Sequence, residues 1–309
     1  MATAPVLMAV TGGGVVDVRG ADTWAFLQSL LAQDLEPLDD GGSAPSLLLS
    51  PQGRLVGVLR VLRVGRDAAL LDTAPGVAPS VVETLQRFRI RVDVELTDLS
   101  PAWDVLTVRG APLEPLLSTA GLGVPPATGR AAAFADGWLH RADWGATPGV
   151  DLVAPRATID RARDALVAAG AIDDAAALDA ERIATGIPLQ GRDVDERTIP
   201  QEAFLERHAV SFTKGCFVGQ ELVCRIDSRG SSVPRYLRHV EVAGDAVPPT
   251  GAHVVVDGTE RGVVTSAARR GDQVVALAMV QRAVEPPADA EVRWDAATVA
   301  ARVLAIDAH

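Results

Sequence analysis

The residues most suited to chemistry lie together in the run Lys214-Gly215-Cys216-Phe217-Val218-Gly219-Gln220-Glu221. Lys214 is the only lysine among the 29 Lys and Arg residues of the chain. An ammonium is a compact point charge, whereas a guanidinium is a planar fork of donors. A lysine two residues before Cys216, in a chain that otherwise uses arginine, therefore indicates a function for an ammonium at this position.

The Cys216 thiol is the candidate nucleophile of this run. Gly215 permits a sharp turn, and we expect a helix from Phe217 onward with Cys216 at its start. A thiol at a helix N-terminus and near an ammonium has a lowered pKa and is more often ionised. The thiolate is the form that attacks disulfides and binds metals. We therefore predict Cys216 and Lys214 as the catalytic residues.

Other candidates carry a weaker signal. Cys224 follows eight residues later and cannot pair with Cys216 within one helix, because a disulfide needs Cα atoms within about 7 Å. We expect Cys224 to be a small buried hydrophobic residue. His208 precedes Cys216 by eight residues, without the carboxylate that would orient a Cys/His pair. No metal site is expected, and two cysteines are too few for a stable iron–sulfur cluster, which takes about four protein ligands.

Composition limits the class of protein. With 48% apolar and 22% charged residues, the chain has the composition of a globular protein. A net charge of −11 disfavours direct contact with nucleic acid and with anionic membranes. The N-terminal stretch has no basic region typical of a secretory signal, and no apolar run approaches the roughly 18 residues of a spanning helix. With two cysteines in all, these features predict a protein of the reducing cytoplasm.

The elements expected along the chain alternate between short strands and helices without a phosphate-binding fingerprint. We expect a strand at Val15–Val18, a helix capped by Asp22, a strand at Leu55–Val64 and a helix from Pro155 to Gly170. This order predicts an α+β fold with antiparallel sheets.

The linker Ser228–Pro234 separates this region from a tail of short strands. Asp257-Gly258 and Gly271-Asp272 are typical of hairpin tips, so the tail is predicted to be a small β-barrel. The predicted domains are residues 1–228, made of two α+β subdomains, and residues 235–309. The strands expected in the tail are Leu237–Val242, His253–Val256, Gly262–Ala267, Val274–Val280 and Val299–Ile306.

The run KGCFVGQE resembles the signature of the YgfZ-type folate-binding proteins, relatives of the glycine-cleavage aminomethyltransferase. Weaker similarities follow in the expected order over nearly the whole chain. They cover Val18–Asp22 with Phe26-Leu27-Gln28, Ser50–Arg54, Asp143–Pro155 and Glu181–Asp193.

The resemblance implies an aminomethyltransferase-like fold, with subdomains around a central folate cavity and a β-barrel at the C-terminal end. It implies tetrahydrofolate or a derivative as cofactor, with Arg182 near the acidic folate tail and Trp144 as a second folate contact. A surface position for Arg182 on a helix is an equal alternative. The motif cysteine corresponds to Cys216, and Gly215, Phe217, Gly219, Gln220 and Glu221 complete the motif.

The resemblance also implies a function, because the family supports iron–sulfur enzymes, including tRNA-modifying ones, and resistance to oxidative stress. The partners implied are iron–sulfur client proteins. Aminomethyltransferases have acids where this chain has Gly57-Val58, and a glutamate where it has Gly145–Gly149. We therefore expect a maintenance factor that uses the Cys216 thiol. The alternatives are a folate-dependent aminomethyl or demethylation transferase, and a protein-binding scaffold without catalysis.

Overall fold

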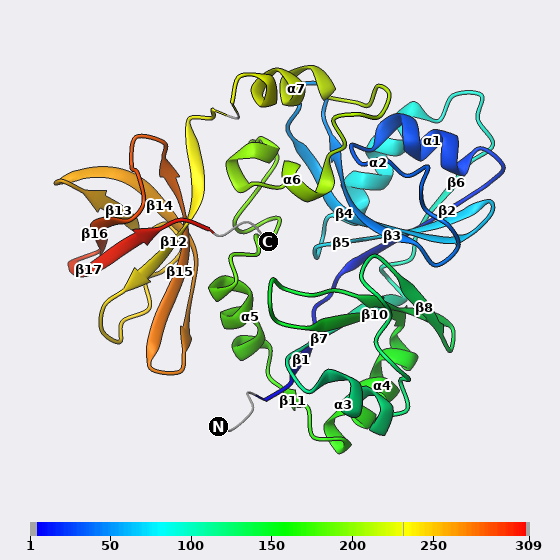
Figure 1. The fold of residues 1–309 in the computed structure, drawn as a ribbon, viewed down its shortest axis with the longest axis horizontal. Coiled ribbons are helices and arrows are strands. Elements are labelled where there is room, and N and C mark those ends of the chain that lie inside the picture. Colours follow the sequence, from blue (N-terminus) through cyan, green and yellow to red (C-terminus); the bar gives the residue numbers. More distant parts are fainter. Residues whose placement is uncertain (1–4, 231, 307–309) are drawn as a thin grey trace. The chain divides into compact units, whose positions relative to one another are not determined.

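The structure is a computed structural model that describes residues 5–230 and 232–306. The chain divides into two compact units, each built from two stretches of sequence. The first unit comprises Met1–Ala175 and Glu206–Glu221, and the second comprises Ala176–Leu205 and Leu222–His309. Each unit has sheets and a core of its own, whose elements are labelled in Figure 1.

The first sheet of the first unit has five antiparallel strands. In spatial order they are β3 (Ser43–Leu49), β4 (Leu55–Gly65), β5 (Ala68–Thr73), β2 (Gly14–Arg19) and β6 (Glu95–Asp98). Along β4, buried residues alternate with half-buried ones, the pattern of a strand with one face in a core. Helices α1 (Thr23–Leu30) and α2 (Ala78–Phe88) contribute Leu27 and Val81 to the same aliphatic core as Val61 of β4.

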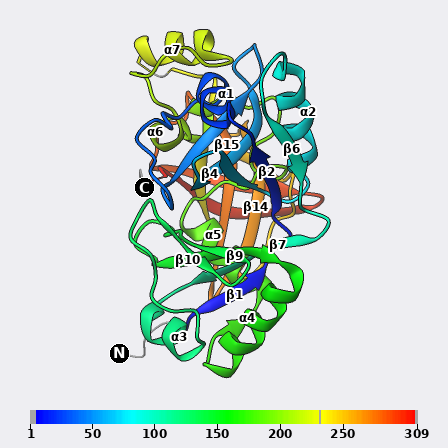
Figure 2. The same cartoon turned by 90° about the vertical axis from the view of Figure 1, so that its right-hand side faces the viewer.

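The second sheet of this unit has six strands and is antiparallel except for one edge pair. Its order is β11 (Ile172–Asp173), β1 (Leu7–Val10), β7 (Trp103–Arg109), β10 (Gly149–Pro155), β9 (Gly137–Arg141) and β8 (Ala131–Phe134). Only β11 and β1 are parallel. Helices α3 (Leu113–Thr119) and α4 (Arg156–Ala168) lie on the same side of this sheet (Figure 2) and bury Leu117 and Leu166 in its core.

A buried group of charged side chains joins these two sheets. Arg60 of β4 donates to both carboxylate oxygens of Asp72 on β5, at 2.9 and 3.0 Å, and to Asp151 on β10 at 3.0 Å. Arg109 of β7 lies 2.8 Å from the other oxygen of Asp151. Burial alone would raise the pKa of Asp151, but Arg109 and Arg60 outweigh it and hold that pKa at about 2. Asp151 is therefore ionised between two buried guanidinium groups, whereas burial raises the pKa of Asp72 despite its pairing with Arg60.

His140, which pairs with Asp151 across β9 and β10, makes stability depend on pH. Its side chain is buried, and burial together with the positive charge of Arg60 lowers its pKa well below the usual value. The folded protein thus keeps His140 neutral, while the unfolded chain takes up a proton below about pH 6.5. Stability should therefore fall as pH drops below about 6.5, by up to about 1.4 kcal/mol per pH unit for this residue.

The measurement is urea unfolding of the wild type and of His140→Gln at pH 7.5, 6.0 and 5.0. In the variant, the free energy of unfolding should depend less on pH over this range, because glutamine does not titrate. Asp151, with a lowered pKa, contributes in a separate window nearer pH 2 to 4. Identical slopes for the two proteins between pH 7.5 and 5.0 would show that His140 does not control this response.

The second unit contains a closed six-stranded barrel with an aliphatic core. In spatial order its strands are β12 (Arg235–Val242), β15 (Gln273–Gln281), β14 (Thr259–Arg270), β13 (His253–Val256), β16 (Ala288–Trp294) and β17 (Ala297–Leu304). The predicted barrel is confirmed. Asp257 and Gly258 both have positive φ, at 50° and 73°, as the tip between β13 and β14 requires. Strand β16 was missed, because only Val292 in it is fully buried.

Helical segments pack on this barrel within the same unit. Helix α5 (Ala175–Ala184) joins it through an ion pair of Glu181 with Arg270 at 2.7 Å. The 3₁₀ helix η1 (Pro200–Ala203) does so through Glu202 and Arg235 at 3.0 Å. The compact unit is thus larger than the sequence-predicted domain of residues 235–309, whose independent folding stays a prediction.

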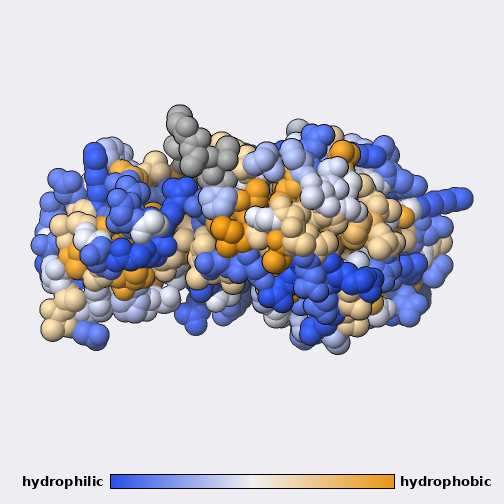
Figure 3. Space-filling view, turned by 90° about the horizontal axis from the view of Figure 1, so that it is seen from below, coloured by the Kyte–Doolittle hydropathy of each residue, from blue (hydrophilic) through white to orange (hydrophobic). Residues whose placement is uncertain are grey.

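Two remaining helices flank the motif: α6 (Glu206–Ala209) and α7 (Gln220–Ser228). In the described part of the chain, no helix is both long and apolar enough to cross a membrane. Figure 3 shows one face of the molecule, on which hydrophilic residues surround smaller apolar patches. The exposed large apolar side chains are Phe88, Ile90, Val124, Val167, Ile172, Phe212, Val247 and Val263.

Candidate functional site

The motif loop lies between α6 and α7 and exposes the Cys216 thiol. The predicted helix from Phe217 was wrong, because α7 begins only at Gln220. Gly219 interrupts the chain with a φ of +79°, a conformation that favours glycine. Cys216 therefore lies in the loop before α7 rather than in its first turn. Gln220 and Glu221 begin the helix, and the Gln220 amide donates to the Phe217 carbonyl at 3.3 Å.

Close packing fixes the loop on one side, at Gly219. A Cβ atom at this position would lie 2.5 Å from the Ser50 carbonyl oxygen and 3.0 Å from the Gly53 Cα. The motif backbone thus rests directly on the turn between β3 and β4. The preceding Phe217 is buried, and Val218 packs against the core below. Two segments that carry the family resemblance, the motif and Ser50–Arg54, are therefore in contact.

Lys214 fixes the loop on the other side. Its Nζ donates to the carbonyl oxygens of Gln28 at 2.6 Å, Leu31 at 2.7 Å and Gln33 at 3.0 Å. Burial lowers the pKa of Lys214, although the nearby carboxylates of Asp34 and Glu36 oppose this shift. Sequence reasoning missed these contacts, since main-chain carbonyls leave no trace in residue type.

Cys224 lies half-buried on α7, in the second compact unit, and both cysteines are free thiols. Among the described residues, no group of three or more His, Cys, Asp and Glu side chains is placed to hold a metal ion. His208 lies on α6, where its main-chain carbonyl accepts a hydrogen bond from Gln33. Of the predicted site residues, Lys214 and Cys216 share one loop with Gly215 and Gly219.

Arg182, the predicted folate contact, is buried in the second unit with its donors already used. Its Nε donates to Asp179 at 2.7 Å, and its Nη1 donates to the Ile187 carbonyl at 2.6 Å and to Asp193 at 2.8 Å. Its Nη2 donates to Ser266 of the barrel at 3.1 Å. Such an arginine has no donor pair left for a folate carboxylate. This geometry supports a structural role for Arg182, and folate binding by it stays a prediction.

Replacing Arg182 by methionine should destabilise the protein by about 3–5 kcal/mol, because it leaves Asp193 charged and buried without its partner. The Asp193 side chain is fully buried. Urea unfolding measures this effect. The matched control is Arg192→Met, since Arg192 is 44% exposed and also pairs with Asp179. The control should cost less than about 1 kcal/mol. Equal losses in the two variants would contradict a structural role for Arg182.

Trp144, the second predicted folate contact, packs against the buried charges of the first unit. The Arg109 guanidinium lies 4.4 Å from the centre of its ring. The Trp144 and Thr147 main chains exchange two hydrogen bonds of 2.9 Å, and the Gly149 amide donates to Asp143 at 2.8 Å. Residues Gly145–Gly149 form a tight turn without a carboxylate. Trp144 lies in the first unit and Arg182 in the second, and their role as folate contacts stays a prediction.

The position of the missing transferase acid also has a physical explanation. Gly57 of β4 is buried beneath α2, and a Cβ atom there would lie 2.7 Å from a methyl carbon of Val81. A side chain at this point would require Val81 to shift. The neighbouring Val58 is half-buried and apolar. A carboxylate is thus absent from both positions, and at Gly57 the Val81 side chain crowds the space that one would need.

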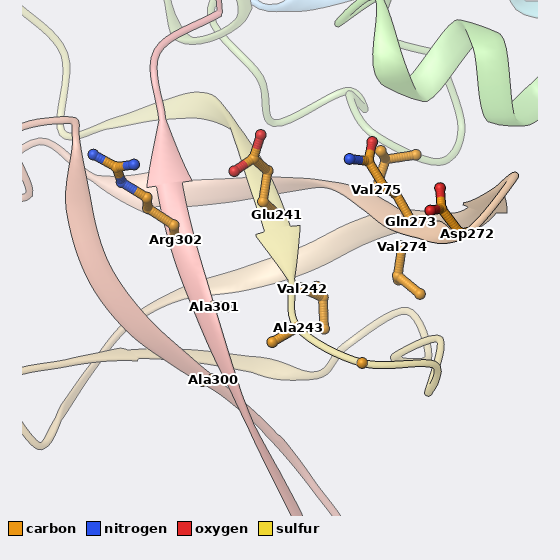
Figure 4. Close-up of a pocket in the computed structure, with 11 residues that line it drawn as sticks. Glu241, Val242, Ala243, Asp272, Gln273, Val274, Val275, Ala300, Ala301 and Arg302 are labelled. Atoms are coloured by element: carbon orange, nitrogen blue, oxygen red, sulfur yellow. The ribbon is translucent and has the colours of Figure 1, made fainter.

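The surface of the described residues includes two hollows. A hollow of about 450 Å³ on the barrel lies between β12, β15 and β17, and Figure 4 shows Glu241, Asp272 and Gln273 projecting from it to the same side. Its two carboxylates and single guanidinium, from Arg302, do not favour an anionic folate tail. A hollow of about 350 Å³ beside α1 is lined by Trp24, Ala25, Gln28, Leu35, Glu36 and Arg63. Neither hollow is lined by Cys216.

Comparison with solved structures defines the class of fold. The glycine cleavage system aminomethyltransferase T from Bartonella henselae superposes with a TM-score of 0.85, over 98% of this chain and 86% of that one, at 21% identity. The predicted aminomethyltransferase-like α+β fold is therefore confirmed. The family model described as the GCVT N-terminal domain matches residues 2–214. The chain belongs to that family.

Two proteins of similar sequence carry different names. An aminomethyltransferase of Herpetosiphon aurantiacus is 28% identical over 81% of this chain and 70% of its own length. The mitochondrial iron-sulfur cluster assembly factor IBA57 homolog of Mycosarcoma maydis is also 28% identical, over 78% of this chain. The chain spans 59% of the length of that homolog. The matched family region ends at Lys214, so Cys216 lies just beyond it.

Proposed function

We propose that this protein supports the assembly or repair of iron–sulfur cluster proteins in the cytoplasm, with Cys216 as its working thiol. The observation that carries the proposal is the loop itself. It exposes Cys216 while Lys214, Phe217 and Gly219 are held against the first unit. The similarity to an iron–sulfur cluster assembly factor homolog supports the same role.

The chemistry open to this site is that of a single accessible thiol. A thiolate can attack a disulfide or persulfide on a client protein, or serve as one ligand to a cluster that the client also binds. One thiol cannot hold a cluster alone, because such clusters take about four protein ligands. The clients must therefore supply the remaining ligands. The exposed Phe212, four residues before Cys216, gives a client protein an apolar contact beside the thiol.

Tetrahydrofolate, or a derivative, is proposed as a ligand on family grounds alone. The family contains folate-dependent transferases, but Arg182 and Trp144 are engaged by protein groups in this chain. No step of the proposed role is assigned to folate. Equilibrium dialysis with tetrahydrofolate tests whether binding is retained.

The proposal is tested in the host by deleting the gene, exposing the cells to oxidant and assaying an iron–sulfur enzyme such as aconitase. We expect enzyme activity to fall on deletion and to return when the wild-type gene is restored. The matched control is a dehydratase or hydrolase without a cluster, whose activity should not change. Unchanged aconitase activity in the deletion strain would refute the maintenance role.

The second candidate is a folate-dependent aminomethyl transferase, favoured by the superposition with aminomethyltransferase T and by the sequence similarity. The glycine at position 57 opposes it, because no carboxylate is present there and the Val81 side chain crowds the space beside it. A turnover assay with an aminomethyl donor and tetrahydrofolate separates the two: the maintenance role predicts no product. A scaffold without chemistry would be indicated if replacement of Cys216 had no effect.

A further inference from the structure

The carbonyl groups at the end of α1 lack a partner from the helix itself. The last carbonyls of a helix have no intrahelical donor and carry the negative end of its dipole. Helix α1 has no basic residue in its last turn, and it is followed by Leu31 in an extended conformation rather than by a glycine. The donor that these carbonyls need must therefore come from elsewhere in the chain.

Lys214 donates to the Gln28 carbonyl in the last turn of α1, and also to the carbonyls of Leu31 and Gln33 in the segment that follows the helix. A protonated amine has three N–H bonds, and three main-chain oxygens surround this one at 2.6, 2.7 and 3.0 Å. All three bonds are thus used, and none is left to stabilise a thiolate at Cys216. A guanidinium spreads its donors over a planar fork and cannot aim three of them from one point. This geometry accounts for a lysine at the one place where the chain has it.

We propose that Lys214 is a positioning residue, which holds the Cys216 loop on the end of α1 and does not act on the sulfur. The ring of Phe217, the residue after Cys216 in the sequence, has its centre 5.7 Å from the Lys214 Nζ. The loop is therefore held before and after the thiol, and Gly215 and Cys216 stay exposed between the two contacts. The inference rests on the proposed function in one respect, namely that Cys216 is the working group.

A role of Lys214 through its charge and a role through its hydrogen-bond geometry predict different results for its variants. If Lys214 acted on the thiolate, any cation would serve, and removing the charge would raise the pKa of Cys216. If Lys214 positions the loop, arginine should fail much as an uncharged residue does, and the ionisation of the thiol should not change.

The test uses Lys214→Met, which keeps the length of the side chain, and Lys214→Arg, which keeps the charge. Both are made in a Cys224→Ser background, so that Cys216 is the only thiol. Hydrogen exchange by mass spectrometry reports on the loop, and the pH midpoint of alkylation by iodoacetamide reports on the thiol. The matched control is Thr213→Ser, at an exposed position next to Lys214, which keeps the hydroxyl that contacts Ser211.

We expect amide exchange over residues 211–219 to rise about 10-fold or more in both Lys214 variants, and not in the control. The alkylation midpoint should stay within about 0.3 of a pH unit in all of them. A midpoint that rises by about one pH unit in Lys214→Met but not in Lys214→Arg would overturn the proposal in favour of a direct electrostatic role. Unchanged exchange would overturn it as well.

The two variants also guard against loss of folding. Amides of β4 serve as an internal reference, because this strand lies in the core of the same unit. If amide exchange in Lys214→Met rises over the whole unit, that variant is unfolded and Lys214→Arg decides the test. Faster exchange confined to residues 211–219 in Lys214→Arg supports the proposal, and exchange as slow as in the wild type contradicts it. Neither readout requires an iron–sulfur enzyme, so a failure of the proposed function leaves this result standing, and the reverse also holds.

Discussion

Replacing Cys216 by serine should abolish the support of iron–sulfur enzymes while leaving the fold intact. The side chain is exposed, so exchanging sulfur for oxygen should change the free energy of unfolding by less than about 0.5 kcal/mol. The serine hydroxyl does not ionise near neutral pH, and unlike a thiolate it neither attacks disulfides nor binds iron well. The change therefore removes the chemistry and keeps the loop.

The measurement is complementation of the deletion strain under oxidant, with aconitase activity as the readout. Wild type should restore activity, and Cys216→Ser should behave like the empty vector. The matched control is Cys224→Ser, a half-buried thiol on α7, which should complement like the wild type. Full rescue by Cys216→Ser would remove the thiol from the mechanism and favour the scaffold. The melting temperature of each purified variant shows that it is folded.

The second large effect is expected at Asp151. Replacement by alanine should destabilise the protein by about 3–5 kcal/mol, because it leaves Arg109 buried without a carboxylate and removes one of the two partners of Arg60. The lowered pKa of Asp151, about 2, shows that this carboxylate is charged across the working pH range. A loss of this size is a large part of the stability of an ordinary domain.

Urea unfolding at pH 7 measures this loss. The matched control is Asp160→Ala on the exposed side of α4, which should change stability by less than about 0.5 kcal/mol. The variant Asp151→Asn keeps the shape and removes the charge, and it should fall between the two. A loss below about 1 kcal/mol for Asp151→Ala would mean that the two sheets do not depend on this network.

Much of the fold could be predicted because aliphatic residues repeat with the period of each element. Strand β4 followed from an apolar run after a turn signal, and the tip at Asp257-Gly258 followed from its turn residues. Strand β16 did not, because one buried valine gives too little alternation. Asp22 lies at the predicted N-cap of α1, but its side chain does not cap the helix. Its carboxylate instead accepts a hydrogen bond from the Asp93 amide at 2.8 Å. A capping residue can be used by a distant segment, and local sequence does not show this.

The candidate site was predictable in residue type and not in contacts. Residue type and spacing in the sequence drew attention to Lys214 and Cys216, and their catalytic role stays a prediction. The hydrogen-bond partners of Lys214 are main-chain carbonyls about 180 residues earlier, which have no residue-type signal. For Arg182 the sequence left two alternatives, a ligand contact and a surface position. The surface position was wrong, because Asp193 and Ser266 from later parts of the chain bury its guanidinium, and the ligand contact stays a prediction.

The contact between Gly57 and Val81 has an evolutionary consequence. A single codon change can turn glycine into aspartate, so a lineage that had lost the transferase acid at this point could in principle regain it in one step. Here that step would place the new Cβ atom 2.7 Å from a methyl carbon of Val81, so that Val81 would have to shift. We therefore expect the acid to return more readily together with a smaller residue at position 81, although that change alone would leave a cavity. The order in which two substitutions arise would then matter for any return to a transferase.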